Sequence, residues 1–392
     1  MPTRILVVDD EPDLELLIRQ KFRKKIRAKE FDFLFAGNGV EALEKLGTWD
    51  DIDIVLTDIN MPVMDGLTLL AELAKLKHVL KSVVVSAYGD IGNIRIAMNR
   101  GAFDFITKPI DFADLEVTLD RSIQELRGFR EGLFAKQRVD AMEKELDVAA
   151  RIQQSILPKT FPPYPDRSEF DIHAAMRPAY QVGGDFYDFY LLDDGHLGFV
   201  IADVAGKGVP AAIVMAVSRS LLKATAVSGA EPGQCVGHVN KLLCGDNTSG
   251  LFVTLFYGIL DTGTGEIAYT NAGHNPPLHL SPGSAVPLEN QGGLVLGVDE
   301  SVKYKTSTLT LQPGESLFLY TDGVTEAMNS EKECYSEDRL RICLEDAKDA
   351  CPSMFTQLVF DHADDFAGAY PQHDDITILA VSYHGANSRG QA

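Results

Sequence analysis

Two groups of residues, each built around aspartates, have the types and spacing that phosphoryl chemistry needs. The members of the first group stand at the ends of apolar runs in the N-terminal third of the chain, and they are Asp9, Asp10, Asp58, Ser86 and Lys108. Three carboxylates repel one another unless a divalent cation lies between them, and Mg²⁺ prefers such oxygen ligands. One carboxylate can then act as the nucleophile toward a phosphoryl group, while the lysine balances charge and the hydroxyl contacts the phosphate oxygens.

The second group consists of aspartates scattered over the C-terminal half, and they are Asp185, Asp203, Asp322, Asp374 and Asp375. Each one lies next to an apolar run, and all but Asp203 stand beside a glycine, a small polar residue or another acid. Such carboxylates form a catalytic site if the fold gathers them around two cations, because paired metals lower the pKa of a shared water and hold both oxygens of a phosphoryl displacement. The sequence pattern alone does not show that gathering.

The first group can meet only if several strands end at the same edge of one sheet. Continuous apolar runs at 5–8, 53–57 and 82–86 have the length of buried strands, and we expect a fifth strand at 103–106. The amphipathic stretches between the runs predict helices at Leu14–Ile26, Val40–Leu46 and 64–76. This alternation predicts a doubly wound α/β sheet of parallel strands, in which sites form at the carboxyl ends of the strands.

A long amphipathic helix is predicted over residues 111–157. Apolar residues such as Leu115, Leu119 and Ile123 recur mostly at steps of three, four or seven, and charged residues fill the gaps. Two interpretations stay open, namely a coiled coil that pairs two copies of the chain and a helical spacer packed on its own domains. The segment PKTFPPYP (158–165) ends the helix, because proline lacks the N–H donor and clashes with the preceding turn.

The C-terminal part of the chain, about 166–385, is expected to be an α+β domain. Alternating patterns predict strands at Phe199–Asp203, Phe252–Leu260, Glu266–Asn271, Ser316–Thr321 and Ile376–Val381. Helices are expected at Ala211–Ala226 and Gln234–Cys244, and hairpin turns at LLDDGHL (191–197) and LDTGTGEI (260–267). Hairpins separated by helix pairs predict two stacked antiparallel sheets flanked by helices.

Composition excludes several classes of protein. The 392 residues carry 36 Lys and Arg against 57 Asp and Glu, a net charge of −21, which disfavours nucleic acid and anionic membranes as partners. No run approaches the roughly 18–20 apolar residues that span a bilayer, and the N-terminus lacks the apolar core of a signal peptide. The 5 cysteines have no zinc spacing and fit a reducing compartment. We therefore expect a cytoplasmic protein.

The motifs VVDDE, LTDINMPVMDG, VVVSA and FITKP, in this order, resemble the receiver domain of bacterial two-component response regulators over about residues 1–121. The resemblance implies that Asp58 is the phospho-acceptor. It also implies a Mg²⁺ site made of Asp9, Asp10, Asp58 and the backbone carbonyl of Asn60, with Ser86 as the switch hydroxyl and Lys108 as the phosphate partner. Phe105 stands where the family has its switch aromatic residue, and it lacks the hydroxyl of a tyrosine.

The motifs GGDFYD, ADVAGKGVPAA, NAGHNPP, YTDGVTEA and DDITIL, preceded by ARIQQSILP (150–158), resemble the metal-dependent (PPM) serine/threonine phosphatases, in the bacterial branch that regulates sigma factors by partner switching. The resemblance implies that Asp203 bridges two Mn²⁺ or Mg²⁺ ions. It places Asp185 and the Val204 carbonyl on one ion, and Asp322 and Asp374 on the other. The neighbouring Asp375 is an alternative to Asp374, because many relatives carry asparagine at that position.

Other polar residues near these motifs have competing interpretations. Asp188 is expected either to support the metal ligands or to be exposed, and His274 either to hold a loop or to transfer protons. Asp193 and Asp194 are expected to be turn residues. Lys207 in AGKG does not belong to a nucleotide-binding loop, because the required upstream glycine and the following Ser or Thr are both missing.

These resemblances divide the chain into a receiver domain (1–121), a helical linker (122–160), a PPM-type phosphatase domain (161–385) and a tail (386–392). They imply a response regulator that is phosphorylated by a histidine kinase or phosphotransfer protein and that dephosphorylates an anti-sigma factor antagonist, as a homodimer joined through the linker. The alternative is a catalytically inactive, phosphatase-like adaptor that binds a sigma factor or its regulator. Whether phosphorylation activates or inhibits is left open.

Overall fold

The computed structural model describes residues 2–76, 78–87, 89–246, 250–289, 293–347 and 350–385. The predicted tail at 386–392 lies outside the described residues. The chain divides into two compact units, Met1–Met142 and Glu143–Ala392, and each is described by itself. The boundary between these units falls inside the predicted linker.

The first unit is built on a five-stranded parallel sheet with the order β2-β1-β3-β4-β5. Its strands are β1 (Thr3–Val8), β2 (Phe31–Ala36), β3 (Ile52–Asp58), β4 (Lys81–Ala87) and β5 (Asp104–Lys108). The connecting helices are α1 (Pro12–Lys21), α2 (Arg23–Arg27), α3 (Gly39–Thr48), α4 (Gly66–Leu73) and α5 (Ile91–Asn99). The predicted doubly wound α/β fold is confirmed. The single helix expected at Leu14–Ile26 is instead two helices, α1 and α2, which meet at the buried Phe22.

The central strands β3 and β4 are apolar along nearly their whole length because both faces of the sheet are covered. Two separate clusters of buried side chains lie on these faces, one containing Ile54, Leu56 and Val85 and the other containing Val55 and Val84. Successive side chains of a strand point to opposite faces, so a continuous apolar run supplies both clusters at once.

Helix α6 (Phe112–Ile156) is one continuous helix of 45 residues, as the periodicity predicts. In the first unit its side chains at Leu115, Leu119 and Ile123 are buried in the hydrophobic core. Residues 131–145 are all exposed, although they include several large apolar side chains. In the second unit the helix becomes partly buried again.

The second unit contains two antiparallel five-stranded sheets, with the orders β13-β10-β9-β8-β7 and β12-β11-β14-β15-β6. The strands of the first sheet are β7 (Phe186–Leu191), β8 (His196–Val204), β9 (Val253–Asp261), β10 (Glu266–Ala272) and β13 (Ser307–Thr310). Those of the second are β6 (Phe170–Arg177), β11 (Leu278–Ser281), β12 (Ser284–Pro287), β14 (Ser316–Tyr320) and β15 (Ile376–Tyr383). Side chains from both sheets share one large core cluster, so the predicted stacked architecture is confirmed.

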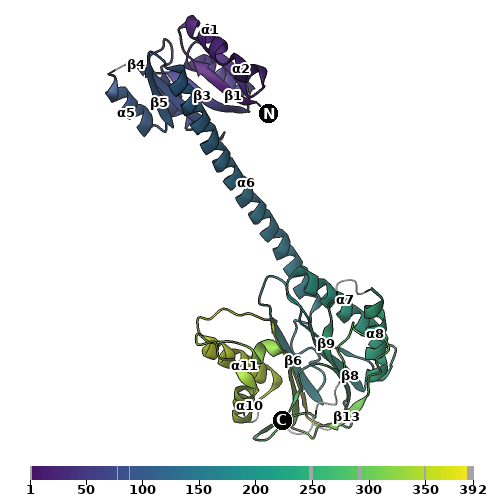
Figure 1. The fold of residues 1–392 in the computed structure, drawn as a ribbon. Helices are drawn as coiled ribbons and strands as arrows, with labels where there is room; N and C mark the ends of the chain where they lie inside the picture. The colour runs from purple at the N-terminus through teal and green to yellow at the C-terminus, as the bar shows by residue number, and fades with distance from the viewer. Residues whose placement is uncertain are drawn as a thin grey trace. The chain divides into compact units, whose positions relative to one another are not determined.

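Helices cover the outer faces of both sheets (Figure 1). α7 (Val209–Ala226) and α8 (Pro232–Asp246) pack on the first sheet, while α10 (Ser336–Asp346) and α11 (Pro352–Ala367) pack on the second. A short helix, α9 (Asp322–Thr325), follows β14 directly. By length and composition α7 is the one described helix that could span a membrane. Its buried residues are spaced mostly three or four apart, as in a helix with one face on a sheet.

Candidate functional site

The first carboxylate group lies at the carboxyl edge of the parallel sheet. Asp9 follows β1, and Asp58 is the last residue of β3, the neighbouring strand. Carboxylate oxygens of Asp9, Asp10 and Asp58 all lie within 4.8 Å of one another, and no other such group of acids, histidines or cysteines occurs in the described part of the chain. The sheet therefore brings together the three acids that the sequence predicts.

Lys108 supplies the positive charge of this group. Its Nζ lies 2.8 Å from Asp58 Oδ2, 3.2 Å from Asp9 Oδ2 and 2.9 Å from Glu11 Oε1. Burial alone would lower the pKa of Lys108, but the hydrogen bonds with Asp58 and Glu11 outweigh it and raise the pKa. Burial also raises the pKa of Asp9. A divalent cation would relieve the charge that these carboxylates hold together.

The Asp58 carboxylate is held at a defined position by its surroundings. Its Oδ1 accepts hydrogen bonds from the backbone N–H groups of Ile59, at 2.7 Å, and of Asn60, at 3.4 Å. Gly66 packs against the backbone of Asp58 so closely that a Cβ there would lie 2.1 Å from the Asp58 carbonyl oxygen. The nucleophile candidate is thus fixed by backbone contacts on one side and by a lysine on the other.

Two switch candidates lie on the neighbouring strands. Ser86 in β4 is fully buried, and its Oγ has no hydrogen-bond partner among the described residues. Phe105 in β5 is 40% exposed. An unpartnered buried hydroxyl costs free energy, and a phosphate oxygen arriving at this edge would satisfy it.

The second carboxylate group forms where the two sheets of the second unit meet. Asp185 precedes β7 and Asp203 lies near the end of β8, so the first sheet contributes both. Asp322 begins α9 after β14, and Asp374 precedes β15, so the second sheet contributes these two. Residues more than 180 positions apart in sequence therefore reach one place because the sheets are stacked.

The pKa shifts show how strongly these carboxylates interact. Burial, followed by the charges of Asp203 and Asp375, raises the pKa of Asp185 well above its ordinary value. Burial and the charges of Asp203, Glu326 and Asp374 raise the pKa of Asp322 to about 7. Burial is likewise the main cause of the raised pKa of Asp203. Clustered acids of this kind fit divalent cations, which would stabilise their ionised forms.

Asp374 and Asp375 are adjacent in sequence but have different contacts. The buried Asp375 accepts hydrogen bonds from the backbone N–H groups of Ala179, at 2.8 Å, and of Gly184, at 2.6 Å. Asp374 is more exposed, and its Oδ2 lies 2.9 Å from Nζ of Lys207. The carboxylate of Asp375 therefore ties together two loops, and that of Asp374 stays accessible to a cation.

Two glycines allow the loops of this site to approach one another. A Cβ at Gly323 would lie 1.9 Å from the carbonyl oxygen of Asp375. A Cβ at Gly184 would lie 2.9 Å from the carbonyl oxygen of Val204. The backbone next to Asp322 and Asp185 can pack this closely only without side chains, and the Val204 carbonyl lies beside the Asp185 loop as a result.

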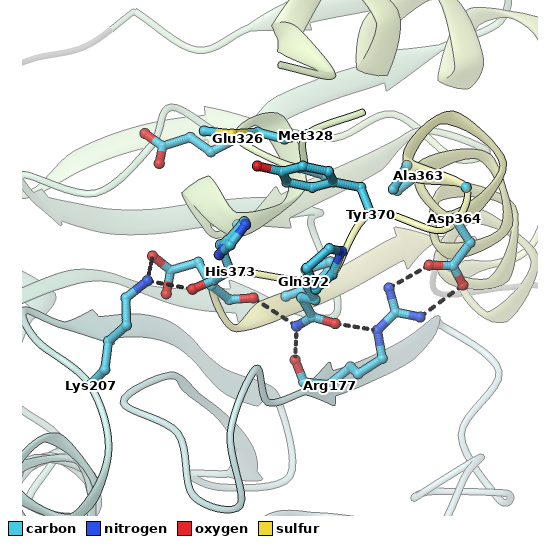
Figure 2. A pocket seen from close by; sticks show the side chains of 16 residues that line it. Arg177, Lys207, Glu326, Met328, Ala363, Asp364, Tyr370, Gln372 and His373 are labelled. Carbon is cyan, nitrogen blue, oxygen red and sulfur yellow. Dashed lines mark hydrogen bonds and ion pairs between the residues drawn. The ribbon is translucent and has the colours of Figure 1, made fainter. Parts of the chain in front are cut away.

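A cleft of about 460 Å³ adjoins the second group, and Lys207, Arg177, Gln372 and Asp374 are among its lining residues. Figure 2 shows the guanidinium of Arg177 between Asp364 and Gln372. Gln372 in turn donates to the carbonyl oxygens of Arg177, at 2.8 Å, and of Asp374, at 2.7 Å. The segment that carries Asp374 is thereby fixed to strand β6.

The remaining polar residues have structural contacts. Asp188 is buried and lies 2.8 Å from a guanidinium nitrogen of Arg219 on α7, so it is not exposed. His274 is also buried, and burial lowers its pKa to about 4. Its Nδ1 lies 2.9 Å from Thr254 Oγ1, an arrangement that favours the loop-holding interpretation. Asp193 lies in the β7–β8 turn and accepts a hydrogen bond from the Gly195 N–H, as expected.

Three residues that the sequence did not single out also belong to the second group. Thr321 donates a hydrogen bond of 2.7 Å to Asp185 Oδ2. Gln153 of α6 contacts the backbone of Gly183, and Gln372 supports the Asp374 segment. For Gln153 there was one indication in the sequence, its position within ARIQQSILP. Nothing in the sequence indicated a role for Thr321 or Gln372.

The chain matches two protein families. Residues 5–120 match the family described as response regulator receiver domain, and residues 193–384 match that described as stage II sporulation protein E (SpoIIE). Protein IcfG of Synechocystis sp. is 32% identical over 280 residues, which are 64% of this chain and 43% of IcfG. Phosphoserine phosphatase RsbU of Bacillus subtilis is 28% identical over 260 residues, which are 66% of this chain and 73% of RsbU.

One solved structure supports the fold of the second unit. The SiaA-PP2C domain of Pseudomonas aeruginosa superposes with a TM-score of 0.56 at 23% identity, covering 63% of this chain and 98% of that domain. The two family matches fall in different parts of the chain, and the fold of the second unit agrees with the second match. The chain therefore joins a response regulator receiver domain to a SpoIIE-family domain of the PPM phosphatase type.

Proposed function

We propose that this protein is a response regulator in which phosphorylation of Asp58 controls a metal-dependent phosphoserine/phosphothreonine protein phosphatase. The observation that carries the proposal is that Asp185, Asp203, Asp322 and Asp374 lie where the two sheets meet, with burial and mutual repulsion raising the pKa of several of them, although no three of these described residues bring their oxygens within 4.8 Å of one another. Asp185 is buried and the other three acids are partly buried, so bound cations would offset the cost of holding their charges close together.

In the receiver, Asp58 is the proposed phospho-acceptor, and Asp9, Asp10 and the Asn60 carbonyl complete the Mg²⁺ site with it. Lys108 already contacts Asp58 and would pair with the phosphate. The buried Ser86 hydroxyl, which has no partner within the described part of the chain, would contact a phosphate oxygen. Phe105 is the proposed switch aromatic residue.

In the phosphatase domain, Asp203 is proposed to bridge two Mn²⁺ or Mg²⁺ ions. Asp185 and the Val204 carbonyl complete one site, and Asp322 and Asp374 the other. Bound metal supplies an ionised water and neutralises phosphate charge. The chain's own contribution is positional, since Thr321 orients Asp185 and Gln372 holds the Asp374 segment.

The proposed substrate is a phosphorylated anti-sigma factor antagonist, and the proposed phosphodonor is a histidine kinase or phosphotransfer protein. Both would meet the protein in the cytoplasm. The names of the relatives RsbU and RsbP, both phosphoserine phosphatases of Bacillus subtilis, support the serine specificity. The exposed apolar residues Leu133, Phe134, Val139 and Met142 on α6 support a homodimer joined through this helix.

The alternative function is a catalytically inactive adaptor that binds a sigma factor or its regulator. Loss of metal-binding carboxylates would favour it, but all four candidates are present and grouped here. The two functions differ in metal binding, because an adaptor does not need the cations.

Hydrolysis of p-nitrophenyl phosphate with and without Mn²⁺ tests the proposal, with Asp203→Ala as the inactive comparison. Beryllofluoride, which mimics a phosphoryl group on Asp58, gives the direction of regulation. We expect metal-dependent turnover that Asp203→Ala abolishes. If turnover is absent and calorimetry detects no Mn²⁺ binding at the second group, the adaptor function becomes the better conclusion.

A further inference from the structure

Lys207 lies beside the phosphatase carboxylates in a turn built to place it there. The residues on both sides are glycines in the left-handed region, with φ of +97° at Gly206 and +72° at Gly208. Residues with side chains rarely adopt these angles. The turn connects Asp203 at the end of β8 to the start of α7 at Val209, so Lys207 is fixed close to a proposed metal ligand.

The ammonium group of Lys207 forms an ion pair with the carboxylate of Asp374, which is also a proposed ligand of a divalent cation. Its Nζ lies 2.9 Å from Asp374 Oδ2 and donates to the carbonyl oxygen of His373. The side chain remains 45% exposed and lines the cleft. A divalent cation held by Asp374 would compete for the same charge, and the ammonium group would then be available to another anion at this place.

Arg177, the other cation that lines the described cleft, is fully engaged. Its two terminal nitrogens lie 2.6 and 2.8 Å from the carboxylate of Asp364, and its Nε donates to Gln372 at 2.8 Å. A bidentate pair of this kind leaves the guanidinium no free edge for a phosphate. Lys207 is therefore the better phosphate ligand.

The cleft beyond Lys207 is suited to a polypeptide rather than to a small phosphate ester alone. Its volume of about 460 Å³ is several times that of a phosphate group. Met328, Ala367 and Tyr370 line it as well, so apolar surface is available next to the charged end. A chain segment with a phosphorylated side chain would place the phosphate near Lys207 and an apolar neighbour against these residues.

We propose that Lys207 binds the phosphoryl group of the substrate and that the adjoining cleft holds the polypeptide segment that carries it. The proposal rests on the proposed phosphatase function and adds the binding site for the phosphorylated residue. Asp374 links the proposed metal site to the proposed phosphate site, since it is a proposed metal ligand and contacts Lys207 in this structure.

The first test is calorimetric binding of inorganic phosphate to the Mn²⁺-loaded, full-length protein. Lys207→Met should weaken phosphate binding by about tenfold or more, the effect of losing one charge-assisted hydrogen bond. Lys207→Arg, which keeps the charge, should retain most of the binding, and Lys241→Met, at an exposed lysine of α8, should behave as wild type. Mn²⁺ should bind Lys207→Met as tightly as wild type or more tightly, because no ammonium group competes for Asp374.

The outcomes separate this proposal from the phosphatase function. If wild type binds Mn²⁺ and hydrolyses p-nitrophenyl phosphate, but Lys207→Met keeps its phosphate affinity and loses Mn²⁺ affinity, Lys207 merely supports Asp374 and the proposal is wrong. If wild type itself binds no Mn²⁺, the phosphatase function fails first. Equal unfolding midpoints of the variants ensure that the comparison concerns folded proteins.

The second test compares free phosphoserine with a ten-residue phosphoserine peptide that carries leucines on both sides of the phosphoserine. Wild type should show a KM for the peptide that is lower by about tenfold, because apolar contacts in the cleft add binding free energy. Met328→Lys should bring the KM for the peptide closer to the KM for free phosphoserine. Equal KM values for the two substrates in wild type would show that the cleft does not hold a polypeptide.

Discussion

Gln153 of helix α6 exchanges two hydrogen bonds with the backbone of Gly183. Its Nε2 donates to the Gly183 carbonyl at 2.6 Å, and its Oε1 accepts from the Gly183 N–H at 3.0 Å. Gly183 stands two residues before Asp185, and Gln153 is buried. The last turns of the long helix are thus joined directly to the loop that carries a proposed metal ligand. A displacement of these last turns would reach the proposed metal site through this pair.

Replacing Gln153 with leucine, a side chain of similar size, should therefore disturb the loop that carries Asp185. The change leaves a buried N–H and a buried carbonyl of Gly183 without partners, which costs about 1–3 kcal/mol for each group. We expect a lower unfolding midpoint and weaker Mn²⁺ binding, measured by thermal denaturation and calorimetry. The neighbouring Gln154 is exposed, so Gln154→Leu is the matched control and should change neither quantity. Unchanged Mn²⁺ affinity in Gln153→Leu would show that the pair does not support the metal site.

Replacement by alanine should affect different properties at the two adjacent acids, stability at Asp375 and Mn²⁺ binding at Asp374. Asp375→Ala removes the acceptor for the Ala179 and Gly184 N–H groups, so it should lower the free energy of unfolding by about 2–4 kcal/mol. Asp374→Ala removes an acid from a repulsive group and should leave stability nearly unchanged while Mn²⁺ binding weakens. Urea unfolding and calorimetry on both variants check this. Loss of stability confined to Asp374→Ala would reverse the assignment.

Much of the fold follows from the sequence because its signals are local. Buried parallel strands appear as continuous apolar runs, and their carboxyl ends share one edge, so Asp9 and Asp58 could be placed together before the structure was known. No range was predicted for strand β2, because Asp32 interrupts the apolar run FDFLFA. The predicted helix at 111–157 is nearly the observed α6, since its periodicity is long and unbroken by proline.

The contacts within the proposed phosphatase site could not be predicted in the same way. Thr321 and Asp185 are 136 residues apart, and Arg177 and Gln372 are 195 residues apart. Neither pair leaves a pattern in a single sequence. The proximity of Thr321 and Asp185 depends on how the two sheets stack, and that of Arg177 and Gln372 on the pairing of β6 with β15 within one sheet. Asp375 contacts the loop that contains Ala179 and Gly184, whereas Asp374 contacts Lys207. The residues next to these two acids in the sequence do not indicate this difference.

Covalent phosphorylation of the receiver should require Asp58 and Mg²⁺. Incubation with acetyl phosphate should add one phosphoryl group to wild type, detected by intact mass, and Asp58→Asn should remain unmodified because an amide is not a nucleophile here. Chelation of Mg²⁺ should prevent the reaction, since Asp9 and Asp58 would otherwise repel the incoming phosphate. Asp13→Asn, at an exposed acid of α1, is the control. Modification of Asp58→Asn would move the acceptor to another residue.

His274 should make the stability of the second unit depend on pH. Its pKa is about 4 when folded, against about 6.5 in an unfolded chain, so below pH 6.5 the unfolded state binds a proton that the folded state does not. The stabilisation is therefore complete above pH 6.5 and is lost as the pH falls toward 4. Between pH 7.5 and pH 5 the loss should be about 2 kcal/mol, from the difference between the two pKa values.

Urea unfolding of wild type and His274→Asn at several pH values isolates this contribution, because the other titrating groups are common to both proteins. The asparagine keeps a polar side chain near Thr254 but does not titrate. The wild-type protein should lose more stability than the variant as the pH falls, and His238→Asn, at an exposed histidine of α8, should follow wild type. Parallel pH profiles for wild type and His274→Asn would show that the pKa of His274 is the same in the folded and unfolded protein. In that case proton transfer by His274 would again be open.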